Sequence, residues 1–230
     1  MLMHRELLQL IRAQGFRPNY PLTYLVGTGI LSASVFPEFA PAILLTSLVL
    51  IVAADTLNRF ERQLFSLMGT LLAAIYPSVT VLSFILIRQS DIDPLVGYGL
   101  ILALLLMVWG NDTFAYLGGK SFGKHLMAPH LSPKKTWEGF ASGFIGAGIG
   151  LWLAMYFGPL DNYSLAELAV LPVIVSVVGP IGDLTISKIK RASGMKDTST
   201  ILPGHGGILD RFDSILLVSP VIYIYITYIL

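Results

Sequence analysis

Acidic residues stand at the points where long apolar runs of this sequence meet polar ones. Asp112 closes one apolar run, Asp183 closes another, and Asp210 and Asp213 open the last. An ionisable group at the end of an apolar span is costly and tends to face a polar cavity. Asp210 and Asp213, three residues apart, would share one face of a helix. Such converging carboxylates predict a site for a hard cation of the Mg²⁺ type, unless each acid simply pairs with a neighbouring lysine or arginine.

A basic stretch with a glycine-rich turn surrounds the last two of these acids. Residues 187–213, SKIKRASGMKDTSTILPGHGGILDRFD, contain five lysines and arginines. The turn Pro203–Gly207 directly precedes an apolar helix, where glycines permit close backbone approach and free N–H groups suit a phosphate. His205 could donate a hydrogen bond to a phosphate oxygen or serve as an acid–base group. Taken alone, such a turn is more often a plain loop.

A second basic segment, residues 132–139, reads SPKKTWEG. Its paired lysines, Lys134 and Lys135, stand beside hydroxyl side chains and could hold an anionic lipid headgroup or a triphosphate. Trp137 suits the membrane interface as an amphipathic anchor. Judged by itself, the segment fits a positively charged span flank with an aromatic belt equally well. Together the two basic regions and the acids indicate a site for phosphates and a metal.

The composition predicts that this site belongs to a polytopic membrane protein. Of 230 residues, 54% are hydrophobic and 13% are charged, with a mean hydropathy of +0.73. That charged fraction is about half of what a soluble domain carries. The chain has no cysteine, which excludes disulfides, thiolate catalysis and thiolate metal sites. The net charge of +1 gives no indication of nucleic-acid binding, and no cleavable signal peptide is evident.

Apolar segments of the length that crosses a bilayer predict an all-α bundle of about seven transmembrane helices. The segments are Pro21–Phe36, Ala40–Ala54, Phe65–Ile87, Leu95–Gly110, Gly139–Phe157, Leu165–Ile181 and Ile208–Leu230. With the N-terminus inside, fourteen of the 15 lysines and arginines lie on the cytoplasmic side and only Arg88 lies outside, as the positive-inside rule expects. Pro77 could kink or break the third segment, but counting two spans there would destroy this asymmetry.

This topology gathers the polar regions on the cytoplasmic side of one domain, 1–230. Residues 1–20 would form a cytoplasmic N-terminal segment, and residues 111–138 and 183–207 would form cytoplasmic active-site loops. The polar cavity between them should open both to the cytoplasm and sideways to the bilayer. A transporter is the alternative from another class, but it would place such acids near the bilayer midplane between inverted repeats. Here the charges lie at one face.

The basic stretch resembles the signature of the phosphatidate cytidylyltransferases, the CDP-diacylglycerol synthases. The matching residues are Ser187, Ile189, Lys190, Arg191, Lys196, Asp197, Pro203, His205, Gly206, Gly207, Asp210, Arg211 and Asp213. The block at 132–139, the preceding Asp112 and the Gly-Asp-Leu lead-in at 182–184 also resemble this family. The resemblance covers roughly residues 65–230, and family members commonly have additional spans before that region.

The resemblance implies the Mg²⁺-dependent reaction CTP + phosphatidic acid → CDP-diacylglycerol + pyrophosphate, in which the protein mainly positions phosphates and neutralises charge. It implies metal ligation by Asp183, Asp210 and Asp213, with a second cation left open. The catalytic set would be Asp183, Ser187, Lys190, Arg191, Lys196, Asp197, His205, Asp210, Arg211 and Asp213. The substrate-binding set would be Asp112, Ser132, Lys134, Lys135, Thr136, Glu138, Gly206 and Gly207.

The resemblance further implies a homodimer in a bacterial inner membrane, with the active site facing the cytoplasm. CTP would arrive from water and phosphatidate from the lipid bilayer. Related CTP-dependent lipid enzymes, a polyprenol kinase or a CDP-archaeol-type synthase, are the alternatives within the superfamily. The full motif favours the diacylglycerol enzyme. The Asp-Gly-x-x-Ala-Arg motif of the CDP-alcohol phosphotransferases is absent from the sequence.

Overall fold

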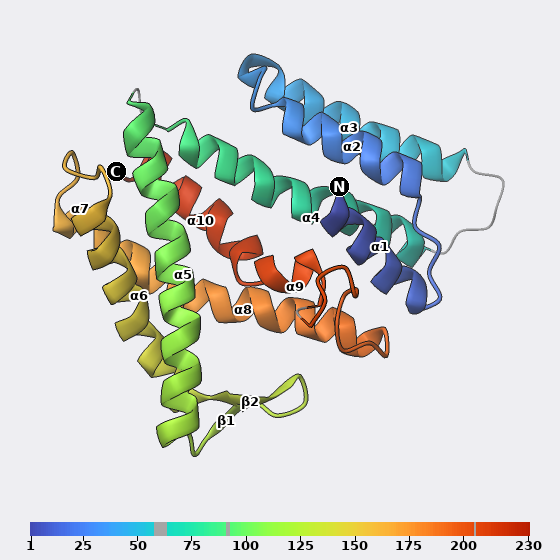
Figure 1. The fold of residues 1–230 in the computed structure, drawn as a ribbon. Helices are drawn as coiled ribbons and strands as arrows, with labels where there is room; N and C mark the ends of the chain where they lie inside the picture. The colour runs from blue at the N-terminus through green and yellow to red at the C-terminus, as the bar shows by residue number, and fades with distance from the viewer. Residues whose placement is uncertain (58–63, 91–92, 205) are drawn as a thin grey trace. The chain divides into compact units, whose positions relative to one another are not determined.

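The computed structural model describes residues 1–57, 64–90, 93–204 and 206–230, and it is helical with one small hairpin (Figure 1). The helices are α1 Leu2–Ala13, α2 Tyr20–Ser32, η1 Pro37–Phe39 (a 3₁₀ turn), α3 Ala40–Thr56, α4 Leu64–Arg88, α5 Pro94–Phe122, α6 Trp137–Phe157, α7 Leu165–Leu168, α8 Val170–Ala192, α9 Ile208–Phe212 and α10 Ile215–Tyr228. Strands β1 (Leu126–Ala128) and β2 (Ser132–Thr136) pair antiparallel. The predicted all-α class is confirmed.

Five helical segments in the described part of the chain are long and apolar enough to cross a membrane. They are η1 with α3, then α4, α5, α6, and α7 with α8. The protein is therefore an integral membrane protein by helix length and composition. α4 runs unbroken across Pro77. The other two predicted spans correspond to α2 and α10, which have 13 and 14 residues where a span needs about 20, so the number seven stays a prediction.

The helices continue beyond the apolar runs, which corrects the expected extent of the polar loops. α5 continues to Phe122 and α8 to Ala192, so the first parts of the predicted loops 111–138 and 183–207 are helical. Adding a residue to an existing helix forms one hydrogen bond for each residue fixed, whether or not that residue is apolar. Basic residues in the last turn of α8 also suit the negative end of the helix dipole.

The last predicted span is interrupted, which corrects a second expectation. Instead of one helix over Ile208–Leu230, α9 ends at Phe212 and α10 begins at Ile215. In the intervening turn, the Asp213 carboxylate accepts a hydrogen bond of 2.7 Å from the N–H of Ser214. Such a local side-chain bond competes with continuation of the helix. Asp213 and Asp210 therefore do not lie on one continuous helix, contrary to the prediction from sequence.

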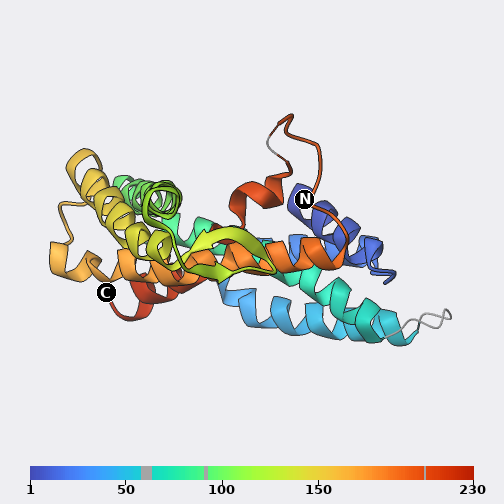
Figure 2. The ribbon, with the colours of Figure 1, turned by 90° about the horizontal axis from the view of Figure 1, so that it is seen from below.

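The chain divides into two compact units. Unit 1 comprises Met1–Leu82 and Lys188–Phe212, and unit 2 comprises Ser83–Ser187 and Asp213–Leu230. In unit 1, α2 and α3 run side by side in both views (Figures 1 and 2). The buried core of this part includes Val26 from α2, which packs in one cluster with residues of α3 and α4.

Unit 2 is built around the close pair α5 and α6 (Figure 1). A Cβ placed on Gly146 of α6 would lie 2.1 Å from the carbonyl oxygen of Gly110 of α5. Glycines at both positions let the two backbones touch, as small residues do between membrane helices. Leu104 and Met107 of α5 are fully buried in the core beside this contact. The pairing fixes the ends of α5 and α6, from which polar side chains extend into a pocket.

Candidate active site

A pocket of about 240 Å³ lies in unit 2. It is lined by residues from two helix ends, the hairpin and α8: Asn111, Asp112, Ala115, Tyr116, Met127, Lys134, Lys135, Thr136, Gly139, Phe140, Pro180 and Asp183. The β1–β2 hairpin thus brings the two predicted lysines to the predicted aspartates of α5 and α8. Thr136 also caps α6, because its hydroxyl accepts a hydrogen bond of 3.1 Å from the N–H of Gly139.

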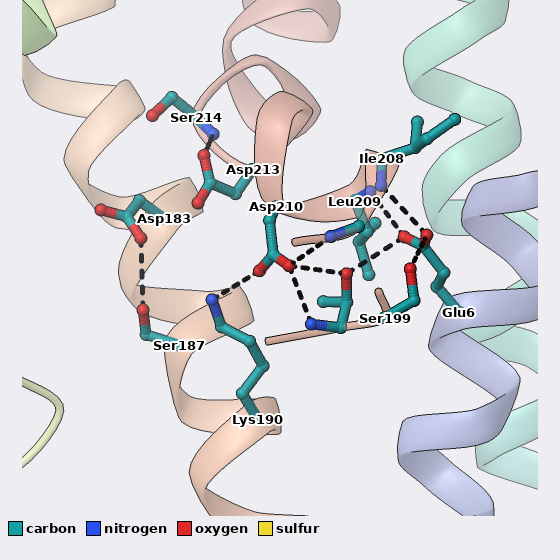
Figure 3. A network of polar contacts seen from close by, with 12 residues as sticks. Glu6, Asp183, Ser187, Lys190, Ser199, Ile208, Leu209, Asp210, Asp213 and Ser214 are labelled. Atoms are coloured by element: carbon teal, nitrogen blue, oxygen red, sulfur yellow. Dashed lines mark hydrogen bonds and ion pairs between the residues drawn. The ribbon is translucent and has the colours of Figure 1, made fainter. Parts of the chain in front are cut away.

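An ion pair between Lys135 and Asp183 crosses this pocket. The hydroxyl of Ser187, one helical turn further along α8, donates a 3.2 Å hydrogen bond to Asp183 Oδ1 (Figure 3). Asp183 therefore has a cation on one oxygen and a hydroxyl on the other. The arrangement joins residues that sequence analysis had placed in separate sets, one catalytic and one substrate-binding.

Asp213 adds a second carboxylate beside Asp183 (Figure 3). Burial, followed by the negative charge of Asp183, raises the pKa of Asp213 to about 8. Asp112 contributes further negative charge to this environment. Like charges held together in this way favour protonation of one of them unless a cation balances the charge. Unit 2 therefore contains converging carboxylates for which Lys135 supplies one positive charge.

Glu138, predicted to bind substrate, has a structural role at the start of α6. Its Oε2 accepts hydrogen bonds from the N–H groups of Lys124 at 3.1 Å and His125 at 3.2 Å. Its Oε1 lies 2.6 Å from His125 Nδ1. These contacts fix the turn that leads from α5 into β1. Glu138 lines a neighbouring pocket with Phe122 and Gly123, and is not among the residues that line the pocket of Asp183.

A second pocket, of about 460 Å³, lies in unit 1 between the end of α8 and the start of α9. Its lining residues are Lys190, Lys196, Asp197, Ser199, Thr200, Leu202, Pro203, Gly204, Gly206, Asp210 and Arg211. Three cations therefore face one polar hollow beside the glycine turn, as expected for a site that receives phosphates. Arg191 is exposed on α8 and is not part of this lining.

Asp210 is the acceptor around which this loop is organised (Figure 3). Its Oδ1 accepts from Lys190 Nζ at 2.7 Å. Its Oδ2 accepts from the N–H of Thr198 at 2.8 Å, the Thr198 hydroxyl at 2.9 Å and the N–H of Gly207 at 2.9 Å. Burial alone would raise the pKa of Asp210, but the Lys190 bond and these donors outweigh it and hold the pKa below its usual range.

The predicted metal ligands are not brought together as a ready-made metal site. Among the residues described, no group of three or more acidic, histidine or cysteine side chains is arranged to hold an ion. Asp183 and Asp213 nevertheless supply neighbouring oxygen donors of the kind that bind Mg²⁺, and a cation would balance the charge of two carboxylates held so close together. The residues therefore fit a divalent cation. Metal ligation by Asp210 stays a prediction.

Two further predicted residues need separate mention. His205 lies outside the described residues. Ser132 begins β2 and does not line the pocket of unit 2. Sequence analysis missed Glu6 of α1, a fully buried acid that binds the loop before α9. The available signal was its position four residues before Leu10, on the apolar side of an amphipathic helix, where a carboxylate needs partners.

The chain is similar to known proteins over most of its length. A model described as "Cytidylyltransferase family" matches residues 1–229. The chain is similar to proteins named phosphatidate cytidylyltransferase in Rickettsia bellii (34% identical over 206 residues, 84% of this chain and 87% of that one) and Rickettsia prowazekii (30% over 216 residues, 90% and 92%). A protein of the same name in Bacillus subtilis is 44% identical over 156 residues, 66% of this chain. The chain spans 57% and 55% of the length of the Rickettsia felis and Bacillus subtilis relatives.

Proposed function

The chain belongs to the cytidylyltransferase family, and from this we propose that it is an enzyme that converts CTP and phosphatidic acid to CDP-diacylglycerol and pyrophosphate. The observation that carries the proposal is the ion pair of Lys135 and Asp183 in the pocket of unit 2, with the carboxylate of Asp213 beside Asp183. A nucleotidyl transfer between two anions at a membrane requires this combination of positive charge and oxygen ligands.

In the proposed reaction, an oxygen of the phosphatidate phosphate attacks the α-phosphorus of CTP. The bond from the α-phosphorus to the bridging oxygen breaks, and pyrophosphate leaves. The lipid carries its own nucleophile, so no covalent intermediate with the protein is needed. The work of the protein is to hold two anions together, and the Lys134 and Lys135 side chains in the pocket supply positive charge for this.

We assign the divalent cation of the reaction to Asp183 and Asp213 and propose that it is Mg²⁺. When bound, the ion would neutralise phosphate oxygens and stabilise the leaving group. Ser187 orients Asp183 through its 3.2 Å hydrogen bond. Lys135, which pairs with Asp183 and lines the pocket, would supply positive charge to a phosphate bound there.

The basic pocket of unit 1 is the proposed site for the triphosphate of CTP. Lys196 and Arg211 line it and give it positive charge. Lys190 is held by Asp210 and thereby kept at the pocket wall. Arginine and lysine together provide both planar and point-charge recognition of phosphate oxygens.

The location and assembly of the enzyme follow from the same proposal. Phosphatidate is a bilayer lipid, so the proposed enzyme takes it from the surrounding membrane. We propose a bacterial inner membrane, with the basic segments facing the cytoplasm, where CTP is found. We also propose that the enzyme is a homodimer.

The test is an assay with purified protein, CTP, phosphatidate and Mg²⁺, in which pyrophosphate and labelled CDP-diacylglycerol are both measured. Asp183→Asn should lower turnover by about 100-fold or more, as expected when charge stabilisation at the reacting phosphates is removed. A panel of lipid acceptors should include an isoprenoid alcohol. Phosphorylation of that alcohol, with no product from phosphatidate, would replace this proposal with a CTP-dependent lipid kinase.

A further inference from the structure

Glu6 of α1 is a buried acid whose partners all come from a segment nearly 200 residues away. The side chain is 0% exposed, and it takes no part in the ion pairs of the described residues. A carboxylate buried without compensation is very costly. Its position therefore calls for a set of hydrogen-bond donors, which the loop before α9 provides.

Each oxygen of Glu6 accepts from one hydroxyl and one backbone N–H (Figure 3). Oε1 accepts from the Ser199 hydroxyl at 2.7 Å and the N–H of Ile208 at 3.0 Å. Oε2 accepts from the Thr198 hydroxyl at 3.1 Å and the N–H of Leu209 at 2.7 Å. Ile208 and Leu209 open α9, and the first N–H groups of a helix have no partner within it. Glu6 thus serves as a helix cap supplied by a distant part of the chain.

The same contacts connect Glu6 to Asp210. The Thr198 hydroxyl lies 3.1 Å from Glu6 Oε2 and 2.9 Å from Asp210 Oδ2. A hydroxyl has one hydrogen to donate, so Thr198 bridges the two acids by sharing it between them. The backbone N–H of Thr198 is bound to Asp210 at 2.8 Å. A shift of Glu6 would therefore move the segment that holds Asp210.

Gly207 shows how closely the loop fits around Glu6. A Cβ at this position would lie 2.1 Å from the Thr198 hydroxyl oxygen and 2.6 Å from Glu6 Oε1. A side chain of any size would displace one of these groups. Gly207, singled out from sequence as a phosphate-approach residue, is thus required to admit the Glu6 carboxylate beneath the turn.

We propose that Glu6 is a positioning residue for the basic pocket of unit 1, acting through Thr198 and Asp210. By fixing residues 198–209, Glu6 keeps Asp210 where it binds Lys190. Lys190 in turn lines the pocket that we assign to the triphosphate. Glu6 does not line the pocket, so its proposed effect is on the position of the pocket residues. This inference rests on the proposed assignment of that pocket to CTP.

The variant Glu6→Gln tests it, because an amide nitrogen cannot accept the bonds that a carboxylate oxygen accepts. The expected result is a rise of about tenfold in the KM for CTP, the effect of losing one hydrogen bond to a charged group, with the KM for phosphatidate unchanged. Glu38→Gln, the same change at an exposed position of η1, is the matched control. A general loss of folded protein would lower kcat alone. An unchanged KM for CTP in folded Glu6→Gln protein overturns the proposal.

Two further measurements keep the test decisive. If Glu6→Gln does not fold, the variants Thr198→Val and Thr198→Ser are tested in its place. Thr198→Val should have a higher KM for CTP than the wild type. Thr198→Ser, which keeps the hydroxyl, should have the wild-type KM for CTP. Equal KM values in both variants contradict the proposal. If the wild-type protein does not turn over CTP with phosphatidate, the proposed function fails separately. In that case amide hydrogen exchange tests the role of Glu6. Glu6→Gln should speed exchange at the amides of Thr198 and Gly207, which bind Asp210. Unchanged exchange at these two amides overturns the inference.

Discussion

Lys190 and Asp210 form a nearly buried ion pair, with Lys190 Nζ 2.7 Å from Asp210 Oδ1 and side-chain exposures of 12% and 8%. The pair joins the last turn of α8 to the first turn of α9 across the glycine-rich loop. Taking two charges out of water is costly, and such a pair is retained only when further donors satisfy the acid. Thr198 and Gly207 provide those donors. The pair therefore fixes the shape of the basic pocket.

Removing one partner of the Lys190–Asp210 pair should lower the free energy of unfolding by much more than the intact pair adds to it. Lys190→Met leaves Asp210 without its cation and should destabilise the protein by about 3 kcal/mol, seen as a lower thermal midpoint in detergent. The pKa of Asp210 should then rise, since its cationic donor is gone. Lys188→Met, an exposed lysine on the same helix, is the control. Equal midpoints for the two variants would show that the ion pair has no structural role.

The cation requirement of unit 2 gives a second prediction. Burial and the charge of Asp183 raise the pKa of Asp213 to about 8, whereas the pKa of this carboxyl in the unfolded chain is near 4. The folded protein therefore loses stability as the pH rises from about 4 to about 8. Without divalent ions, Asp213→Asn should therefore raise the thermal midpoint at pH 8 by about 10 °C or more, because a pKa displaced by about four units corresponds to roughly 5 kcal/mol. At pH 4 the variant and the wild type should unfold together.

Added Mg²⁺ distinguishes this effect from ordinary stabilisation. It should raise the midpoint of the wild type in a concentration-dependent manner and have much less effect on Asp213→Asn. Asp161→Asn, at an exposed position between α6 and α7, is the matched control and should respond as the wild type does. An equal Mg²⁺ response in Asp213→Asn and wild type would exclude Asp213 as a ligand.

The hairpin lysine gives a third prediction, for activity. Lys135→Met removes the only cation paired with Asp183 among the described ion pairs and should lower kcat/KM by about 100-fold, as loss of a group that stabilises developing charge does. Lys124→Met, an exposed lysine before the hairpin, should retain activity. A decrease of the same size in both variants would point to general loss of positive charge instead of a specific role.

Much of this arrangement could be predicted from sequence because it depends on local pattern. Asp112, Asp183 and the Lys134–Lys135 pair stand at the ends of apolar runs, and hydropathy alone places such ends together at one side of a bundle. The helical class followed from the same apolar runs. Residue types at the ends of these runs thus identified the charged residues that line the pocket of unit 2, Asp112, Lys134, Lys135 and Asp183.

Other features depend on contacts that local pattern does not encode. Glu6 has its partners at residues 198–209, and no local pattern connects the two segments. The break at Asp213 was missed because hydropathy is continuous across Ile208–Leu230, whereas the helix is interrupted by a turn. Glu138 belongs to the expected motif, yet its oxygens are occupied by the turn before β1. A motif identifies residues without separating those that hold the backbone from those that meet the substrate.

The glycine contact between α5 and α6 gives a fourth prediction, for folding. Gly146→Val places side-chain atoms where a Cβ alone would be 2.1 Å from the Gly110 carbonyl oxygen, so the helices must separate. Loss of monodisperse, detergent-soluble protein is expected. Gly148→Val on the same helix is the control, because a Cβ at that position meets no atom within 4 Å. Normal folding of Gly146→Val would mean that the two helices need not touch at this point.

The last prediction concerns the buried histidine of α1. His4 is 1% exposed, and its Nε2 lies 2.9 Å from the Ser78 hydroxyl. Burial lowers the pKa of His4 from 6.5 to about 4, so the folded state holds the neutral ring while the unfolded chain binds a proton below pH 6.5. The stability that depends on the neutral ring is therefore complete above pH 6.5 and is lost as the pH falls toward 4, by on the order of 3 kcal/mol in all.

Thermal unfolding between pH 7 and pH 4 measures this dependence. His4→Gln removes the titrating group while keeping a hydrogen-bonding side chain toward Ser78, so its midpoint should start lower at pH 7 and fall less steeply with acid than that of the wild type. His130→Gln, at an exposed position in the β1–β2 turn, should follow the wild-type profile. Parallel profiles for His4→Gln and wild type would show that proton uptake elsewhere governs acid unfolding. A flatter profile for His4→Gln alone would assign the acid sensitivity of unit 1 to the packing of α1 against α4, the helix that carries Ser78.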